Sequence, residues 1–397
     1  MKKAELVFIP SPGISHLVPT VEVAKLLVDR DERLSITFLV MKLRSDPKVD
    51  RFIDSVSTAC NRIRFIHLSK LEPDPNQPNN LFVSLIESQK SNVKEEVSRL
   101  VSRSESSPGS PTLAGFVLDM FCTSMIDVAN EFGVPSYIFL TSSAACLGLL
   151  FYVQALHDEQ KVDPTEFKGS DTELVMPCLA NLLPAKLLPS VMLNKEWLSF
   201  LITPTRRFRE TKGIMVNTFE ELESHAINSF SNGNTPPVYP VGPILNLNRD
   251  GDRHVESDTF KDIKQWLDEQ PLSSVVYLCF GSMGSFGVDQ VKEIACGLEQ
   301  SGHRFLWSLR QPPPNEMGLG VEIKMDYRGE FQLDGDEYNI VSAGEIERGV
   351  RCLMELDNEK RERLKEMSGK SRKVLENGGT SSSWLGRFIQ DVMDHQP

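Results

Sequence analysis

Short apolar runs alternate with longer amphipathic stretches through the first half of the chain. The apolar runs at residues 5–9, 34–40 and 113–118 predict strands, since near-continuous apolar segments are typical of parallel strands buried on both faces. Residues 17–28 and 80–102 carry apolar positions at helical spacing and predict helices. Strands and helices in alternation are the pattern of a doubly wound α/β domain.

The alternation continues toward the middle of the chain and then meets a proline-rich stretch. Residues 136–140 and 213–218 predict two further strands. Residues 235–258 hold four prolines and two glycines, which makes this stretch the best linker candidate. We therefore expect a first domain at residues 1–240 and a linker at residues 241–258.

After the linker the alternation restarts but does not run as far. Residues 274–280 predict a strand, residues 288–301 a helix and residues 304–308 a strand, whereas the chain from Ala343 onward is helical in pattern. A sheet usually contains about four to six strands, and this part supplies two or three. The second domain, expected at residues 259–380, is therefore predicted to be incomplete.

Composition and charge narrow the class of protein. The chain has 397 residues, of which 40% are hydrophobic and 25% charged, as in a soluble protein of two or three domains. A net charge of −12 without a basic stripe argues against a nucleic-acid partner. The seven cysteines are scattered and lack C-x-x-C spacing, which argues against a disulfide framework or a zinc site.

Targeting and membrane signals are weak in this sequence. The first apolar run is too short for a secretory leader. The longest apolar patch, residues 144–153, is well short of the roughly 20 residues that span a bilayer. We expect a cytoplasmic protein without stable membrane insertion.

Two polar residues follow predicted strands of the first domain. His16 comes after the first strand and its proline-glycine loop, and Asp119 comes after the strand at residues 113–118. Because the carboxyl ends of parallel strands share one edge, the two side chains are expected to meet there. A carboxylate beside an imidazole fixes its tautomer and stabilises the imidazolium. Taken singly, His16 also fits an ordinary loop residue that caps backbone, and Asp119 fits a helix cap.

A loop of small residues follows the first strand of the second domain. The glycines of residues 281–287 let backbone N–H groups approach phosphate oxygens, and Ser282 and Ser285 add hydroxyls. The loop has no lysine and no dinucleotide fingerprint, so alone it is a weak signal.

Several motifs in combination carry a resemblance to a known family. They are F-I-P-S-P-G-I-S-H-L at residues 8–17, G-F-V-L-D-M-F-C at 115–122, P-S-Y-I-F-L-T-S at 135–142, K-G-I-M-V-N-T-F at 212–219, Y-P-V-G-P at 239–243, residues 275–287, and the ending from Glu345. Together they cover nearly the whole chain. The chain resembles the plant UDP-dependent glycosyltransferases of secondary metabolism, whose fold, called GT-B, consists of two facing Rossmann-like domains.

The resemblance implies a reaction and a set of site residues. His16 would deprotonate an acceptor hydroxyl with Asp119 as its partner, and the hydroxyl would displace UDP from a UDP-sugar with inversion and without a metal. The implied acceptors are flavonoids, other phenols and terpenoids, and the implied sugar is glucose. The implied donor-binding residues are Thr141, Gly281, Ser282, Met283, Gly284 and Ser285. The implied acceptor-binding residues are Ser15, Met120, Phe121, Cys122, Met192 and Trp197.

The chain departs from the family's pattern after Trp307. There the family carries a donor-binding segment with a W-A-P-Q start, an H-C-G-W-N-S core and a D/E-Q end, and none of the three follows Trp307 here. We therefore expect weak binding of the UDP-sugar donor. The alternative is a non-catalytic small-molecule-binding or partner protein derived from such an enzyme. An incomplete sheet is also expected to expose apolar surface around Val276, Leu278 and Phe305, which favours self-association.

The end of the chain predicts one more amphipathic helix. Its apolar stripe consists of Trp384, Leu385, Phe388, Ile389 and Val392. By the resemblance, residues 381–397 are expected to pack back onto the first domain. The alternative is a helix on the surface of the second domain.

Overall fold

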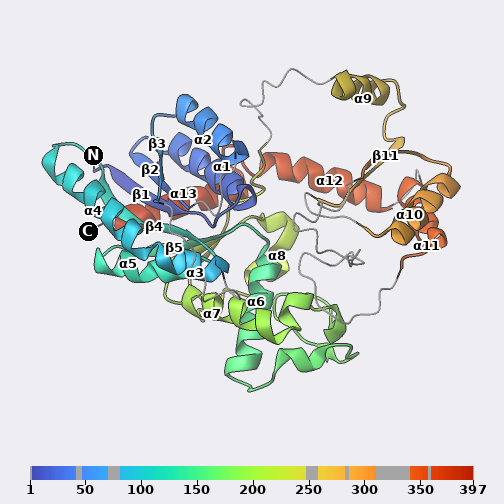
Figure 1. Cartoon of the computed structure of the whole chain (residues 1–397), viewed down its shortest axis with the longest axis horizontal. Helices are drawn as coiled ribbons and strands as arrows, with labels where there is room; N and C mark the ends of the chain where they lie inside the picture. The colour runs from blue at the N-terminus through green and yellow to red at the C-terminus, as the bar shows by residue number, and fades with distance from the viewer. Residues whose placement is uncertain are drawn as a thin grey trace, which may run out of the picture. The chain divides into compact units, whose positions relative to one another are not determined.

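The structure of the protein is a computed structural model. The residues that this structure describes are 2–41, 47–69, 81–246, 258–281, 286–309, 340–355 and 359–396. The chain divides into two compact units, the first formed by Met1–Asp252 with Gly369–Pro397 and the second by Arg253–Ser368 (Figure 1). The domain limits expected at residues 240, 258 and 380 stay a prediction.

The first unit is built on a seven-stranded sheet in the order β3-β2-β1-β4-β5-β8-β9. The strands are β1 (Ala4–Ile9), β2 (Leu34–Val40), β3 (Ile63–His67), β4 (Thr112–Asp119), β5 (Ser136–Leu140), β8 (Gly213–Val216) and β9 (Val238–Pro240). All neighbouring strands in it are parallel. The strand order reverses between β1 and β4, and ligands of such sheets bind beyond the carboxyl ends of the strands at that point.

Helices cover both faces of this sheet, as expected for an α/β fold (Figure 1). Leu6 and Phe8 of β1 belong to the core under α1 (Ile14–Arg30), α2 (Pro47–Ala59) and α13 (Thr380–Asp394). Val7 and Ile9 point into the opposite core, which α4 (Lys90–Ser106), α5 (Ile126–Glu131), α6 (Ala144–Asp158) and α7 (Lys195–Phe208) help to form. The unit also contains α3 (Leu81–Ser88), α8 (Glu220–Asn228) and a short antiparallel pair, β6 (Glu173–Leu174) with β7 (Leu183–Pro184).

Helix α13 joins the end of the chain to the first unit. Phe388 is fully buried, with its ring centroid 5.0 Å from that of Tyr137 and 5.5 Å from that of Tyr239. The Tyr239 hydroxyl donates to the Asp391 carboxylate, and the Ser381 hydroxyl donates to the Gly242 carbonyl oxygen at 2.5 Å. The apolar stripe of this helix therefore completes the core beneath the sheet.

Three local expectations need correction. The single helix expected at residues 80–102 is broken at Gln89, whose buried side-chain amide donates to the Ser69 carbonyl oxygen at 3.2 Å, so α3 and α4 are separate. The proline-rich stretch at residues 235–258 contains β9, a parallel edge strand in which Pro240 is tolerated. His16 lies in the first turn of α1 and not in the preceding loop, because Gly13, at φ 121°, starts the helix earlier than apolar spacing suggested.

The second unit contains a two-stranded parallel sheet among its described residues. Its elements are α9 (Asp258–Asp268), β10 (Val275–Cys279), α10 (Val288–Ser301), β11 (Arg304–Ser308), α11 (Ala343–Met354) and α12 (Glu359–Lys373), the last of which ends in the first unit. Helix α10 supplies the buried Ile294 and Leu298, whereas α11 and α12 bury none of their described residues. The core of this unit is therefore small.

The apolar edge expected in the second unit differs from the prediction. Val276 is buried and Leu278 is half-buried, whereas Phe305 is 40% exposed and Tyr277 63% exposed. Val276 and Phe305 are register partners, so one face of this sheet is partly covered and partly open. Across both units, no helix among the described residues is long and apolar enough to cross a membrane.

Candidate functional site

His16 and Asp119 meet beside the point where the strand order of the sheet reverses. Asp119 is the last residue of β4, and His16 lies in the turn of α1 that follows β1. The His16 Nδ1 atom is 2.8 Å from the Asp119 Oδ2 atom. An ionised carboxylate only accepts hydrogen bonds, so Nδ1 carries the proton and Nε2 keeps a lone pair. The contact expected between these residues is confirmed.

Asp119 is held by three donors although it is almost completely buried, at 3% exposure. Besides His16, the Ser11 hydroxyl donates to Oδ1 at 2.5 Å and the Phe121 backbone N–H donates to Oδ1 at 3.1 Å. Buried carboxylates are tolerated when their oxygens are satisfied in this way. The neighbouring Cys122 is buried too, and burial raises the pKa of its thiol, so this side chain is neutral.

The environment of His16 suits a base. Burial by itself lowers the pKa of His16, but the hydrogen bond and the charge of Asp119 outweigh it, and the pKa is raised. The side chain remains 24% exposed, so a small molecule can reach it. A neutral imidazole with an accessible nitrogen and a buried carboxylate behind it can take a proton from a bound hydroxyl.

Aromatic side chains form a cluster next to this pair. The Phe121 ring lies edge-on to His16 with centroids 5.9 Å apart, and stacks on Phe200 of α7 at 4.7 Å. Trp197, one turn earlier on α7, lies edge-on to Phe200 at 6.0 Å. Aromatic surfaces of this kind suit planar apolar ligands.

The other expected acceptor residues are distributed around this place. Ser15 is exposed in the first turn of α1, and Met120 is half-buried directly after β4. Cys122 and Met192 are buried within the apolar core. The exposed and half-buried surface near His16 therefore comes from the other expected residues and from Phe200.

The expected donor residues are only partly described. Thr141 is half-buried directly after β5, at the same end of the sheet as Asp119. Gly281 is exposed after β10 and has φ 77°, a conformation that glycine adopts readily. Ser282, Met283, Gly284 and Ser285 lie outside the described residues.

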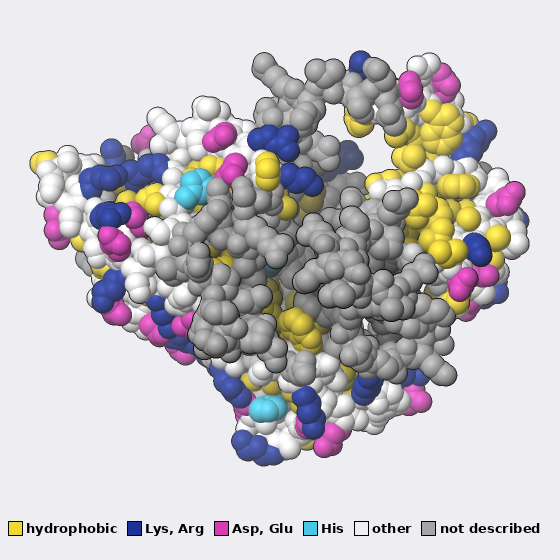
Figure 2. Space-filling model, in the orientation of Figure 1, with side chains coloured by type: hydrophobic (Ala, Val, Ile, Leu, Met, Phe, Trp, Pro, Cys, Tyr) yellow, Lys and Arg dark blue, Asp and Glu magenta, His cyan; other side chains and the backbone are white. Residues whose placement is uncertain are grey.

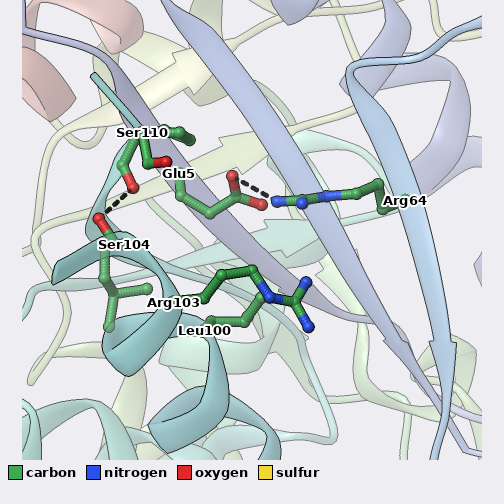
Figure 3. Close-up of a pocket in the computed structure, with 8 residues that line it drawn as sticks. Glu5, Arg64, Leu100, Arg103, Ser104 and Ser110 are labelled. Atoms are coloured by element: carbon green, nitrogen blue, oxygen red, sulfur yellow. Dashed lines mark hydrogen bonds and ion pairs between the residues drawn. The ribbon is translucent and has the colours of Figure 1, made fainter. Parts of the chain in front are cut away.

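A small cavity of about 50 Å³ lies at the other end of the strands (Figure 3). It is lined by early residues of β1, β3 and β4 and by the end of α4, including Glu5, Arg64 and Arg103. Glu5 is buried and accepts hydrogen bonds from Ser35, Thr37 and Arg64. The residues that line this cavity include no histidine, and Glu5 is paired with Arg64, so we place no transfer chemistry here.

Two residues beside His16 and Asp119 escaped the sequence analysis. Ser11 lies within the first motif, but nothing in that motif singles it out from its neighbours. Phe200 follows Trp197 by three positions, and a W-x-x-F spacing on a helix does place both rings on one face. Among the described residues no group of three or more His, Cys, Asp or Glu side chains is arranged to hold a metal ion.

Known proteins resemble this chain over almost its full length. A UDP-glycosyltransferase of Malus domestica is 42% identical, with 98% of this chain and 100% of that protein covered. The UDP-glucose flavonoid 3-O-glucosyltransferase 6 of Fragaria ananassa is 44% identical, with 99% of each chain covered.

The solved structures that resemble this chain are also glycosyltransferases, as the sequence relatives are. A transferase from Siraitia grosvenorii in complex with UDP has a TM-score of 0.82 and 36% identity, covering 98% of this chain and 100% of that one. A Medicago truncatula glycosyltransferase complexed with UDP-glucose has a TM-score of 0.81 and 32% identity, covering 98% of each chain. These close matches support the GT-B class that the sequence predicted.

A family profile gives the same assignment for the middle of the chain. Residues 195–324 match the family described as UDP-glucoronosyl and UDP-glucosyl transferase. The relatives at more than 40% identity extend that assignment to almost the whole chain. This chain belongs to the family of UDP-glucoronosyl and UDP-glucosyl transferases.

Proposed function

We propose that this chain transfers a sugar, glucose in the first instance, from a UDP-sugar to a hydroxyl of a small apolar acceptor such as a flavonoid, another phenol or a terpenoid. The observation that carries the proposal is the hydrogen-bonded His16–Asp119 pair next to the aromatic cluster. Relatives with flavonoid and anthocyanidin glucosyltransferase names support the acceptor class.

The proposed step is a direct displacement with His16 as general base. The Nε2 atom of His16 takes the proton of the acceptor hydroxyl, and the oxygen forms a bond to the anomeric carbon. The bond from that carbon to the phosphate oxygen breaks, and UDP leaves with the electron pair, which inverts the configuration. Asp119 accepts the hydrogen bond from Nδ1, which keeps that proton on His16, and its negative charge stabilises the imidazolium. No metal is part of this step.

The aromatic cluster is the proposed wall for the acceptor ring. Phe200→Ala removes the ring that stacks on Phe121 and should raise the KM for a flavonoid acceptor about tenfold, as expected for the loss of one aromatic contact. Phe230→Ala is a matched control, since Phe230 is also half-buried in the first unit but lies against Phe151. Equal acceptor KM values in the two variants would contradict the assignment of Phe200 to the acceptor site.

We further infer that donor binding limits the activity of this chain. The alignment with the Malus relative runs over 484 positions, more than the 397 residues of this chain, although it covers all of that relative. Part of the relative therefore has no counterpart here, and the absent motifs after Trp307 point to the donor segment. Loss of uracil stacking and ribose hydrogen bonds should weaken the free energy of UDP binding by several kcal/mol. Each change of about 1.4 kcal/mol corresponds to a tenfold change in affinity.

The same observation favours a second candidate function. If the first unit binds a flavonoid but the chain does not bind UDP, the chain would act as a small-molecule-binding or partner protein and not as a transferase. Titration of the flavonoid and of UDP into the same protein separates the two functions, because only the transferase binds both.

Self-association and location in the cell are further proposals. Figure 2 shows hydrophobic side chains gathered over α9 and α10, and Phe260, Trp266 and Phe305 are each at least 37% exposed. We expect sedimentation velocity to detect oligomers, and we expect Phe305→Lys to reduce their fraction. A monomer at all concentrations would contradict self-association.

We propose the cytoplasm as the location of the protein in the cell, and imaging of a fluorescent fusion in leaf cells tests this location.

The transferase proposal is tested by product formation. The purified chain is incubated with millimolar UDP-glucose and a flavonoid, and the product is followed by mass spectrometry and its anomeric configuration by NMR. We expect slow formation of a β-glucoside that is lost in His16→Ala. An α-glucoside, or equal rates in both proteins, would contradict the mechanism.

A further inference from the structure

Ser11 connects the loop after β1 to the carboxylate at the end of β4. Its side chain is buried, with 2% of the residue exposed, and its hydroxyl donates to the Asp119 Oδ1 atom at 2.5 Å. The backbone N–H of Phe121 donates to the same oxygen at 3.1 Å. Oδ1 is therefore occupied by two donors that come from opposite sides of the place where the strand order reverses.

This arrangement leaves the second oxygen of Asp119 for His16. A carboxylate without such restraint can rotate about its terminal bond, whose preferences are broad. Rotation here would break the bonds from Ser11 and Phe121 together with the bond from His16 to Oδ2. The Ser11 hydroxyl thus restricts which way Oδ2 points, and through it which imidazole nitrogen carries the proton.

We propose that Ser11 is a positioning residue for the His16–Asp119 pair, because its hydroxyl holds the carboxylate in the orientation that keeps the proton on His16 Nδ1. Ser11 is buried and bonds to Asp119, so we assign it no contact with substrate or with the reacting atoms. The kinetic consequence rests on the proposed transfer function, whereas the effect on the imidazole does not require a donor or an acceptor.

Cys122 is the neighbour that could replace the Ser11 hydroxyl as a donor to Asp119. The Cys122 Sγ atom lies 3.6 Å from the Ser11 Oγ atom, and burial keeps this thiol neutral by raising its pKa. A thiol is a weak donor, so Cys122 replaces the lost hydroxyl poorly. Among the described residues, Asp119 is the charged group that acts on His16, and Cys122 is the other titratable side chain beside the carboxylate.

The direct test measures the proton on His16 in the protein without substrates. Long-range proton–nitrogen NMR spectra report the tautomer, and His16→Gln identifies the His16 signals among those of the seven histidines. We expect neutral His16 to be protonated on Nδ1 in the natural chain. Ser11→Ala should give a mixture of both tautomers, and Ser11→Thr, which keeps a hydroxyl, should restore the single form.

Ser124→Ala is the matched control for a buried serine in the same region. Ser124 is also buried, in the short 3-10 helix that follows β4 (Thr123–Met125), and its hydroxyl has no hydrogen-bond partner among the described residues. It should leave the His16 tautomer unchanged. If Ser11→Ala does not fold, Ser11→Cys keeps the volume with a weaker donor and should still populate the second tautomer. An unchanged tautomer in folded Ser11→Ala or Ser11→Cys would overturn the proposal.

Kinetics separate this proposal from the proposed function. At saturating substrates, Ser11→Ala should lower kcat about tenfold, the size expected for one hydrogen bond to a charged group, and leave the acceptor KM within about twofold. A purely structural role would instead lower the fraction of active protein and the Tm without changing the pH profile. If the natural chain shows no transfer, the proposed function fails while the tautomer measurement still decides the role of Ser11.

Discussion

The two units of this chain bury their sheets to very different degrees. In the first, seven of the eight residues of β4 are buried and both faces of the sheet carry helices. In the second, β10 has one buried residue and β11 has none among the described strands. The proposed base His16 and the aromatic cluster lie in the well-packed unit. Acceptor chemistry that depends on the first unit is therefore expected to persist even if the second unit binds the donor poorly, as proposed.

Equivalent phenylalanine truncations in the two units test this comparison most strongly. Phe388→Ala empties a fully buried site against Tyr137 and Tyr239 and should cost about 3–5 kcal/mol of unfolding free energy. Phe305→Ala removes a ring that is 40% exposed and should cost less than about 1 kcal/mol. Chemical denaturation followed by circular dichroism measures both. Similar losses in the two variants would contradict the difference in packing.

Removal of the proposed base tests whether function follows the first unit. His16→Ala should lower transfer on the order of 10²-fold or more, the range of general-base catalysis. The change should leave UDP affinity unaltered, because His16 is assigned to the acceptor. His225→Ala, at an exposed histidine of α8, is the control. Transfer retained in His16→Ala, or lost equally in the control, would argue against this base.

The pH dependence of transfer sharpens the assignment of Asp119. The pKa of His16 is raised despite burial because Asp119 stabilises the imidazolium, and the base works only when neutral. Transfer should therefore fall as pH decreases through that raised pKa. Asp119→Asn removes the raising cause and should move this limb to lower pH. A rate–pH profile with an unmoved acid limb would contradict the pairing.

The stability of the folded chain should also depend on pH through His16, with a smaller effect than on transfer. A histidine with a raised pKa in the folded state adds stability that is fully present below its unfolded pKa, about 6.5, and is lost as pH rises through the folded value. The Tm difference between the natural chain and Asp119→Asn, compared at pH 5.5 and pH 8.5, measures this contribution. An Asp119→Asn deficit that does not grow at acid pH would speak against the linkage.

The sequence predicted most of the first unit because its strands are apolar runs that end at loop residues. The edge shared by His16 and Asp119 followed from the rule that carboxyl ends of parallel strands lie together. The start of α1 was misplaced, since apolar spacing does not register the turn that Gly13 begins. Ser11 could not be identified because its role depends on a bond to a residue 108 positions away.

The second unit was predicted in outline from local pattern alone. The bounds of α10 and β11 agree with the periodicity, but the burial of Val276 depends on how one face of the sheet is covered. Such coverage is a tertiary property, and strand patterns do not specify it when one face is left open.

We propose that the first unit of this chain binds the acceptor and carries the catalytic base, whereas the second unit binds the UDP-sugar donor poorly. Isothermal titration of UDP into the purified chain, at a concentration where sedimentation velocity detects monomer, tests this proposal, with a flavonoid titrated into the same preparation as the internal reference. We expect the flavonoid to bind in the micromolar range and UDP to bind in the millimolar range or more weakly. Micromolar UDP binding would contradict it.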